Sequence, residues 1–104
     1  MNLLNKEIKS SLPPLFSQDA NRDPIVYAKL FAPDMSWKCY IAEGSENGSE
    51  FVIYGFFDGY VKTWGQLSLI ELQSKAKRNG LTIQLDQCFR PTLLSEALRA
   101  DNQP

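Results

Sequence analysis

The segment from Val26 to Leu72 limits the possible folds most strongly, because it places β-forming residues between turn signals. It holds ten of the twelve aromatic residues of the 104-residue chain. Aromatic and β-branched residues are enriched in strands, whereas glycine, proline, asparagine and aspartate mark turns. The segment therefore predicts consecutive strands that are followed by a helix.

Four runs of β-forming residues predict a four-stranded antiparallel meander. The runs are Ile25 to Phe31, Trp37 to Ala42, Phe51 to Phe57, and Tyr60 to Leu67. A turn at Pro33 should join the first two strands, and a polar loop from Glu43 to Ser49 should join the next two. Asp58-Gly59 predicts a two-residue hairpin turn, since glycine and aspartate tolerate the positive φ of a type I′ turn. Gly55 and Gly65 interrupt strong strands, which indicates a bulge or a close approach of another backbone.

Helices are expected on both sides of the meander. Ser68 and Glu71 have the spacing of a capping box, which predicts a helix that ends near Asn79-Gly80. Thr92 is the expected cap of a last helix. The chain is then one α+β domain over residues 1–104, in which short N-terminal, middle and C-terminal helices pack on the sheet. Its predicted parts are a helix and Pro-Pro segment (1–16, helical over 2–10), the meander (25–67), a helix (68–79), an extended segment (81–90) and a helix (92–100).

The composition removes several kinds of catalytic site. The chain has no histidine, so it has no Ser-His or Cys-His nucleophile pair and lacks the commonest metal ligand. Cys39 and Cys88 alone cannot form an ordinary structural zinc site. We expect two free buried thiols, with one disulfide as the alternative. No cofactor is expected.

The charge and the first residues bear on partners and location. A net charge of −1 gives no overall attraction to nucleic acid or to an anionic membrane, so such binding would need a local basic patch. The chain begins without a basic, apolar signal sequence, and no apolar stretch approaches 18 residues. We expect a cytoplasmic protein with no membrane contact.

An ordered series of short motifs is similar to a known family. The motifs are residues 12–16 (LPPLF), 28–34 (AKLFAPD), 37–44 (WKCYIAEG), 54–56 (YGF) with Gly59, 64–72 (WGQLSLIEL) and 89–96 (FRPTLLSE). Together they resemble the bacterial domain of unknown function family 2958 over nearly the whole chain. The resemblance implies a small single-domain protein, often encoded on plasmids and other mobile elements, and implies no established activity. The chain departs from the family at residues 81–84, where members have a proline-containing turn.

One sheet face is a candidate binding surface. A two-residue turn at Asp58-Gly59 would pair Phe57 with Tyr60 and Ile53 with Trp64, and paired residues share a face. Aromatic rings would then alternate with cations on this face, at Tyr27, Lys29, Tyr60, Lys62 and Trp64. Single-stranded nucleic acid binders combine such groups, and a protein partner or a second copy of the chain could use the same surface. Alternatively, the rings belong to the core and the lysines extend outward to solvent.

Carboxylates in turns and at strand ends provide an alternative function. Asp34, Glu43 and Asp58 could form a magnesium site of a metal-dependent nuclease or hydrolase, because such a site needs only two or three converging carboxylates. Turn chemistry also explains Asp34 and Asp58. A basic cluster of Lys75, Lys77 and Arg78 complements the dipole at the end of the capped helix. The leading interpretation is a non-enzymatic accessory or binding protein of a bacterial mobile element, which contacts a protein or single-stranded nucleic acid through the sheet face.

Overall fold

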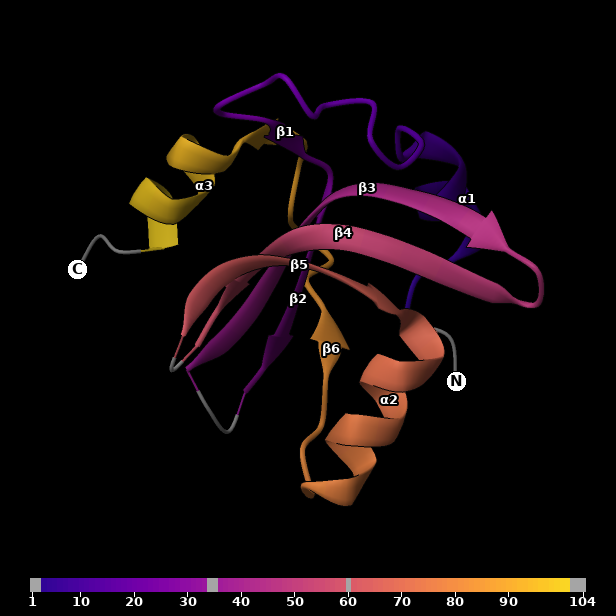
Figure 1. Cartoon of the computed structure of the whole chain (residues 1–104). Coiled ribbons are helices and arrows are strands. Elements are labelled where there is room, and N and C mark those ends of the chain that lie inside the picture. Colours follow the sequence, from indigo (N-terminus) through magenta and orange to yellow (C-terminus); the bar gives the residue numbers. More distant parts are fainter. Residues whose placement is uncertain (1–2, 34–35, 60, 102–104) are drawn as a thin grey trace.

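The computed structural model describes residues 3–33, 36–59 and 61–101, and these form an α+β fold (Figure 1). The elements, in chain order, are α1 (Lys6–Ser11), β1 (Ile25–Val26), β2 (Ala28–Ala32), β3 (Trp37–Asn47), β4 (Glu50–Asp58), β5 (Lys62–Ser68), α2 (Leu69–Arg78), β6 (Gln84–Leu85), β7 (Thr92–Leu93) and α3 (Leu94–Asp101). An antiparallel sheet has the order β5-β4-β3-β2-β6, and β1 pairs with β7 in a separate antiparallel ribbon. The fold class is confirmed, and the main sheet has five strands rather than four.

The hairpin of β3 and β4 is longer than the sequence predicts. The residues 43–49 were expected to form a polar loop, but β3 continues through this segment and pairs with β4 as far as Asn47 opposite Glu50. The turn consists of Gly48 and Ser49, and Gly48 takes a φ of +65°. The end of this hairpin is exposed to solvent, so its strand residues are polar and resemble a loop in composition.

The predicted two-residue turn at Asp58-Gly59 is wrong. Asp58 pairs with Lys62, so three residues join β4 to β5. The register differs from the expected one by an odd number of positions, which exchanges the two faces of β5. Trp64 therefore lies opposite Phe56, and Ile53 lies opposite Leu67. This register packs the half-buried Leu67 against the core cluster and leaves Lys62 exposed to solvent.

The sheet buries a separate apolar cluster on each face. The cluster under α2 and the N-terminal segment contains Leu4, Leu12, Ala28, Leu30, Cys39, Ile41, Phe51, Ile53, Leu69 and Leu72. The cluster under α3 and the ribbon contains Val26, Tyr40, Ala42, Leu94 and Ala97. Figure 1 shows α2 and α3 on opposite sides of the strands. Both faces are thus covered by helices over part of their area.

The start and the end of α2 are those that the local sequence predicts. The Ser68 hydroxyl accepts a hydrogen bond from the Glu71 amide over 3.0 Å, as the capping box predicts. The helix ends at Arg78 with Asn79 as its C-cap, and Gly80 takes a φ of +68°. The first helix is shorter than predicted, because the Asn5 side chain caps it and it begins at Lys6.

The last helix is capped from elsewhere in the chain. Thr92 was expected to be its cap, but Thr92 lies in β7 opposite Val26. The helix begins at Leu94, whose amide donates to the carbonyl of Pro24, while the Ser95 amide donates to the carboxylate of Asp23. The prediction of a helix in this region is confirmed, and its start and its cap were wrong.

The first predicted strand is divided into two. Residues 25–26 pair with β7, whereas residues 28–32 join the main sheet, and Tyr27 lies between them. The expected short edge strand within residues 81–90 is present as β6, which pairs with β2. Both cysteines are free; Cys39 is buried as expected, but Cys88 is exposed. No helix among the described residues is long and apolar enough to cross a membrane.

Candidate functional site

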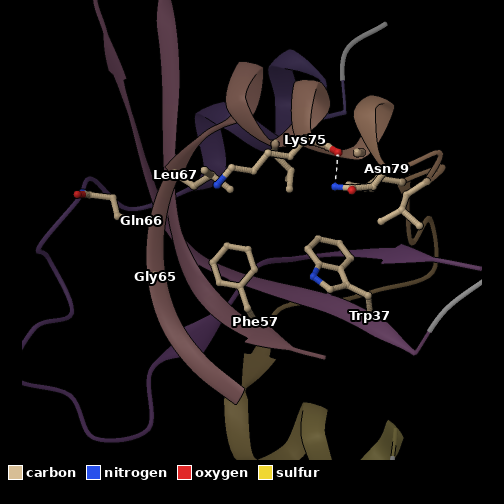
Figure 2. Close-up of a pocket in the computed structure, with 11 residues that line it drawn as sticks. Trp37, Phe57, Gly65, Gln66, Leu67, Lys75 and Asn79 are labelled. Carbon is tan, nitrogen blue, oxygen red and sulfur yellow. Dashed lines mark hydrogen bonds between the residues drawn. The ribbon is translucent and has the colours of Figure 1, made fainter. Parts of the chain in front are cut away.

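An apolar cavity of about 380 Å³ lies between α2 and the main sheet (Figure 2). Its lining comes from three strands, from α2 and from the segment that follows it: Trp37, Phe57, Gly65, Gln66, Leu67, Leu72, Lys75, Ala76, Asn79, Leu81 and Ile83. Most of these residues are apolar, and the cavity is in the size range of ligand-binding pockets. The arrangement is therefore suited to holding an apolar group.

Two aromatic rings form one wall of the cavity. Trp37 begins β3 and Phe57 lies near the end of β4, and their ring centroids are 6.1 Å apart at an angle of 47°. Gly65 on the neighbouring strand leaves room for the phenyl ring, because a Cβ there would lie 3.1 Å from Cε2 of Phe57. Leu72 and Ala76 contribute to the lining from α2. A small residue at position 76 keeps the space between helix and sheet open.

The polar groups of the cavity lie at its border. Lys75 is the single charged residue among the described lining residues, and it is exposed. Figure 2 shows its side chain extending along the helix side of the cavity toward Leu67. The Asn79 side-chain amide donates to the Lys75 carbonyl over 2.8 Å and closes the end of the helix. The cavity thus offers apolar walls with one cation, and its described lining holds no nucleophile with an adjacent base.

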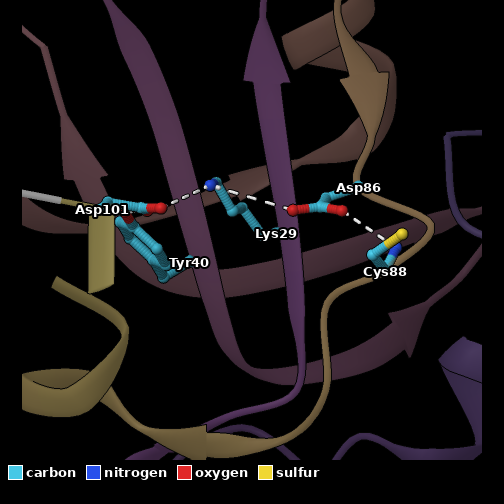
Figure 3. A network of polar contacts seen from close by, with 5 residues as sticks. All are labelled: Lys29, Tyr40, Asp86, Cys88 and Asp101. Carbon is cyan, nitrogen blue, oxygen red and sulfur yellow. Dashed lines mark hydrogen bonds and ion pairs between the residues drawn. The ribbon is translucent and has the colours of Figure 1, made fainter. Parts of the chain in front are cut away.

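Lys29, one of the five predicted binding residues, is engaged in a polar network (Figure 3). Its Nζ lies 3.0 Å from Oδ1 of Asp101 and 3.8 Å from Oδ2 of Asp86, and its side chain is 12% exposed. The Tyr40 hydroxyl also donates a hydrogen bond to Asp101. Burial, and then this bond, raise the pKa of the Tyr40 phenol. The ammonium group of Lys29 is thereby used to hold α3 on the sheet.

The other predicted binding residues are not brought together as a single platform. Trp64 stacks on Tyr54 with centroids 5.1 Å apart and meets the edge of Phe56 at 5.5 Å. Lys62 is exposed opposite Asp58, and Tyr27 packs against the cluster on the opposite face from Trp64. Tyr60 lies outside the described residues. The observed pairing still places Lys29, Lys62 and Trp64 on the same face of the sheet. Lys29 is engaged with Asp101 and Trp64 stacks on Tyr54, so these side chains do not form an open row of rings and cations.

Glu43 of the alternative carboxylate site has a structural role. An irregularity of β3 between Ile41 and Glu43 places this side chain opposite Tyr54. The residue is 2% exposed, and its two carboxylate oxygens accept the amides of Phe16 and Gln18, each over 2.7 Å. These bonds hold the turn that follows Pro13-Pro14 against the sheet.

The three carboxylates of that site do not form a described metal centre. Glu43 is paired with Tyr54, and Asp58 lies four positions further along β4, which corresponds to roughly 13 Å. Asp34 lies outside the described residues. Within residues 3–33, 36–59 and 61–101, no group of three histidine, cysteine, aspartate or glutamate residues could hold a metal ion.

Neither a family model, nor a curated protein, nor a solved structure matches this chain. The resemblance to the domain of unknown function family 2958 therefore stays a prediction. A function for this protein must therefore be inferred from the arrangement of its own side chains.

The cavity does not follow from sequence patterns alone. One wall of the cavity could be predicted from local sequence, because Leu72, Ala76 and Asn79 recur at helical spacing on one side of α2. The opposite wall depends on the strand register, since only the observed pairing places Gly65 beside Phe57 and turns Leu67 toward the apolar cluster under α2. The sequence predicts for Lys75 only a place in the basic cluster at the end of the helix, and not a place at the border of a cavity.

Proposed function

We propose that the protein is a non-enzymatic binding protein that accommodates an apolar side chain of a protein partner between α2 and the sheet. The observation that supports this function is the cavity of about 380 Å³ walled by Trp37, Phe57 and aliphatic side chains. Pockets that hold ligands combine mainly apolar walls with a few polar groups. If the family resemblance is right, the role is that of an accessory protein of a bacterial mobile element.

A protein partner agrees better with the described contacts than single-stranded nucleic acid. Counterion release drives much of nucleic-acid affinity, and this chain has a net charge of −1. Lys29 is paired with two carboxylates, and Trp64 already stacks on Tyr54. A metal-dependent hydrolase is supported less, because both oxygens of Glu43 already accept backbone amides.

The neutral dye N-phenyl-1-naphthylamine tests whether the cavity accepts an apolar group. Its emission should rise and shift to the blue on addition of the protein, and the increase should saturate at one dye per chain. Ala76→Leu should abolish most of the increase, because residue 76 lines the cavity and a larger side chain there fills it. Circular dichroism of the variant shows whether the fold is kept.

Val61→Ser is the matched control, because Val61 is an exposed apolar residue outside the cavity lining. This variant should bind the dye like the unchanged protein. No dye binding at all, or an equal loss in Val61→Ser and Ala76→Leu, would rule out the cavity as the binding site.

A further inference from the structure

We infer that the partner presents an extended, acidic segment, which pairs with the outer edge of β5 and inserts one apolar side chain into the cavity. This inference rests on the proposed function and adds the conformation and the charge of the partner segment. Three features of the chain lead to it: an edge strand, the position of the cavity beside that strand, and an excess of cations around both.

The first feature is the long edge strand of the main sheet. Among the described strands, β5 pairs on one side only, with β4, over the seven residues Lys62–Ser68. The strand at the opposite edge, β6, has only two residues. An edge strand presents unpaired amide and carbonyl groups, to which an extended peptide can add as a further strand.

The second feature is that the cavity is lined by this same edge strand. Gly65, Gln66 and Leu67 of β5 contribute to its lining, together with α2. A peptide that runs along β5 would therefore pass beside the cavity. Because alternate side chains of an extended chain point to the same side, one of them can enter the cavity while its neighbours point away. A partner helix could not form the backbone hydrogen bonds that the edge strand leaves available.

The third feature is the charge of the two elements that border the cavity. Over residues 62–78, four exposed cations accompany a single carboxylate, although the whole chain has a net charge of −1. The cations are Lys62, Lys75, Lys77 and Arg78, and the carboxylate is Glu71. Lys62 lies opposite Asp58 of β4, so the three cations of α2 supply the excess. An acidic segment complements this local charge, which would also repel basic competitors.

A peptide selection on the whole protein tests the inference. A phage-displayed library of random decapeptides serves as the probe, and enriched sequences are synthesised and measured by fluorescence anisotropy. We expect an aromatic or branched aliphatic residue flanked by aspartate or glutamate. The synthetic peptide should displace N-phenyl-1-naphthylamine, bind more weakly at high salt, and slow hydrogen exchange of amides in residues 62–68.

A matched pair of charge reversals locates the contact. Lys75→Glu should weaken peptide binding by about tenfold, because it replaces an attraction at the cavity border by a repulsion. Lys6→Glu makes the same change on the exposed face of α1 and should leave the affinity unchanged.

Three results would overturn the inference. These are a selection without acidic sequences, equal effects of the two charge reversals, and unchanged exchange of the β5 amides in the bound state. Binding of oligothymidylate that Lys75→Glu abolishes while the β5 amides exchange as before would instead assign the cations to nucleic acid. In each case dye binding in the cavity is measured separately, so that the proposed function can stand while this inference fails.

Discussion

Lys29 and Asp101 are 72 residues apart in the sequence, and their charged groups meet at 3.0 Å. The contact joins β2 to the last turn of α3, and Tyr40 from the middle of the sheet donates to the same carboxylate. This network lies beside the cluster that α3 covers, where Val26 and Tyr40 are fully buried. The last described residue of the chain therefore fixes a helix on the sheet.

The stability of the fold should depend on the protonation of Asp101. Burial alone would raise the pKa of this carboxyl group, but hydrogen bonds from Tyr40 and Lys29 outweigh it and hold the pKa below its ordinary value. A carboxyl group whose pKa is lower in the folded state than in the unfolded state stabilises the fold. The stabilisation is complete at pH values above the unfolded-state pKa of about 3.9, and it is lost as the pH falls through the folded-state pKa. Asp101→Asn should lower the free energy of unfolding at neutral pH by about 1–3 kcal/mol. It should also reduce the loss of stability between neutral and acidic pH, which urea unfolding at several pH values measures.

Glu96→Gln is the matched control for this prediction. Glu96 lies on the same helix, and its carboxylate pairs with Arg99 at the exposed surface. Exposed ion pairs of this kind contribute at most about 1 kcal/mol. If both variants had the same pH profile of stability, the network at Asp101 would not be what anchors the helix.

The start of α3 should depend on a residue far away in the sequence. Asp23 accepts hydrogen bonds from the hydroxyl and the amide of Ser95, and these bonds lower the pKa of its carboxyl group. Asp23→Ala should lower the free energy of unfolding by about 1 kcal/mol, the usual effect of losing a side-chain cap. Asp23→Asn should cost less because it keeps one acceptor oxygen. Thermal unfolding of both variants measures the difference, and equal destabilisation by alanine and asparagine would contradict the capping role.

The two longer helices show why some elements could be predicted and others only in part. The Ser68 hydroxyl that caps α2 and the Glu71 amide that it accepts are three positions apart, so a local motif predicts the start of this helix. The cap of α3 is supplied by Asp23, and no local pattern around residue 92 contains this information. Local propensity placed the strands approximately, whereas the register required knowing that Leu67 must lie opposite Ile53.

The same reasoning explains the outcome for the candidate site. Lysine and glutamate in a β-rich sequence are expected at the surface, where they could contact a ligand or a metal ion. In the structure, Lys29 and Glu43 instead bond to segments that are 25 or more residues away in sequence. These partners become neighbours only through the tertiary fold. The cavity depends in addition on the placement of α2 above Trp37 and Phe57, which the strand and helix patterns do not specify.

Phe16 is strained, and glycine should relieve the strain. Its φ is +74°, a value that costs a residue with a side chain roughly 1–2 kcal/mol, and its side chain is 68% exposed. Phe16→Gly should therefore raise the free energy of unfolding by up to about 1 kcal/mol, after the entropy of the unfolded glycine is subtracted. Ala20→Gly, an exposed position of the same loop, should lower it. Urea unfolding decides the sign, and a loss of stability in Phe16→Gly would show that the ring makes contacts that outweigh the strain.

Gly55 should tolerate substitution least among the glycines of the sheet. A Cβ at this position would lie 2.5 Å from the carbonyl oxygen of Tyr40, and a backbone atom in the centre of a sheet cannot move aside. Gly55→Ala should therefore lower the free energy of unfolding by about 3 kcal/mol, the upper end of the usual cost of overpacking.

Gly65→Ala is the matched control, because its Cβ would lie 3.1 Å from the ring of Phe57, which can rotate slightly into the neighbouring cavity. This variant should lose less than about 1 kcal/mol, and it should also narrow the cavity and weaken dye binding. Urea unfolding of both variants tests the difference, and equal destabilisation would mean that the space beside Phe57 is as closely packed as the centre of the sheet.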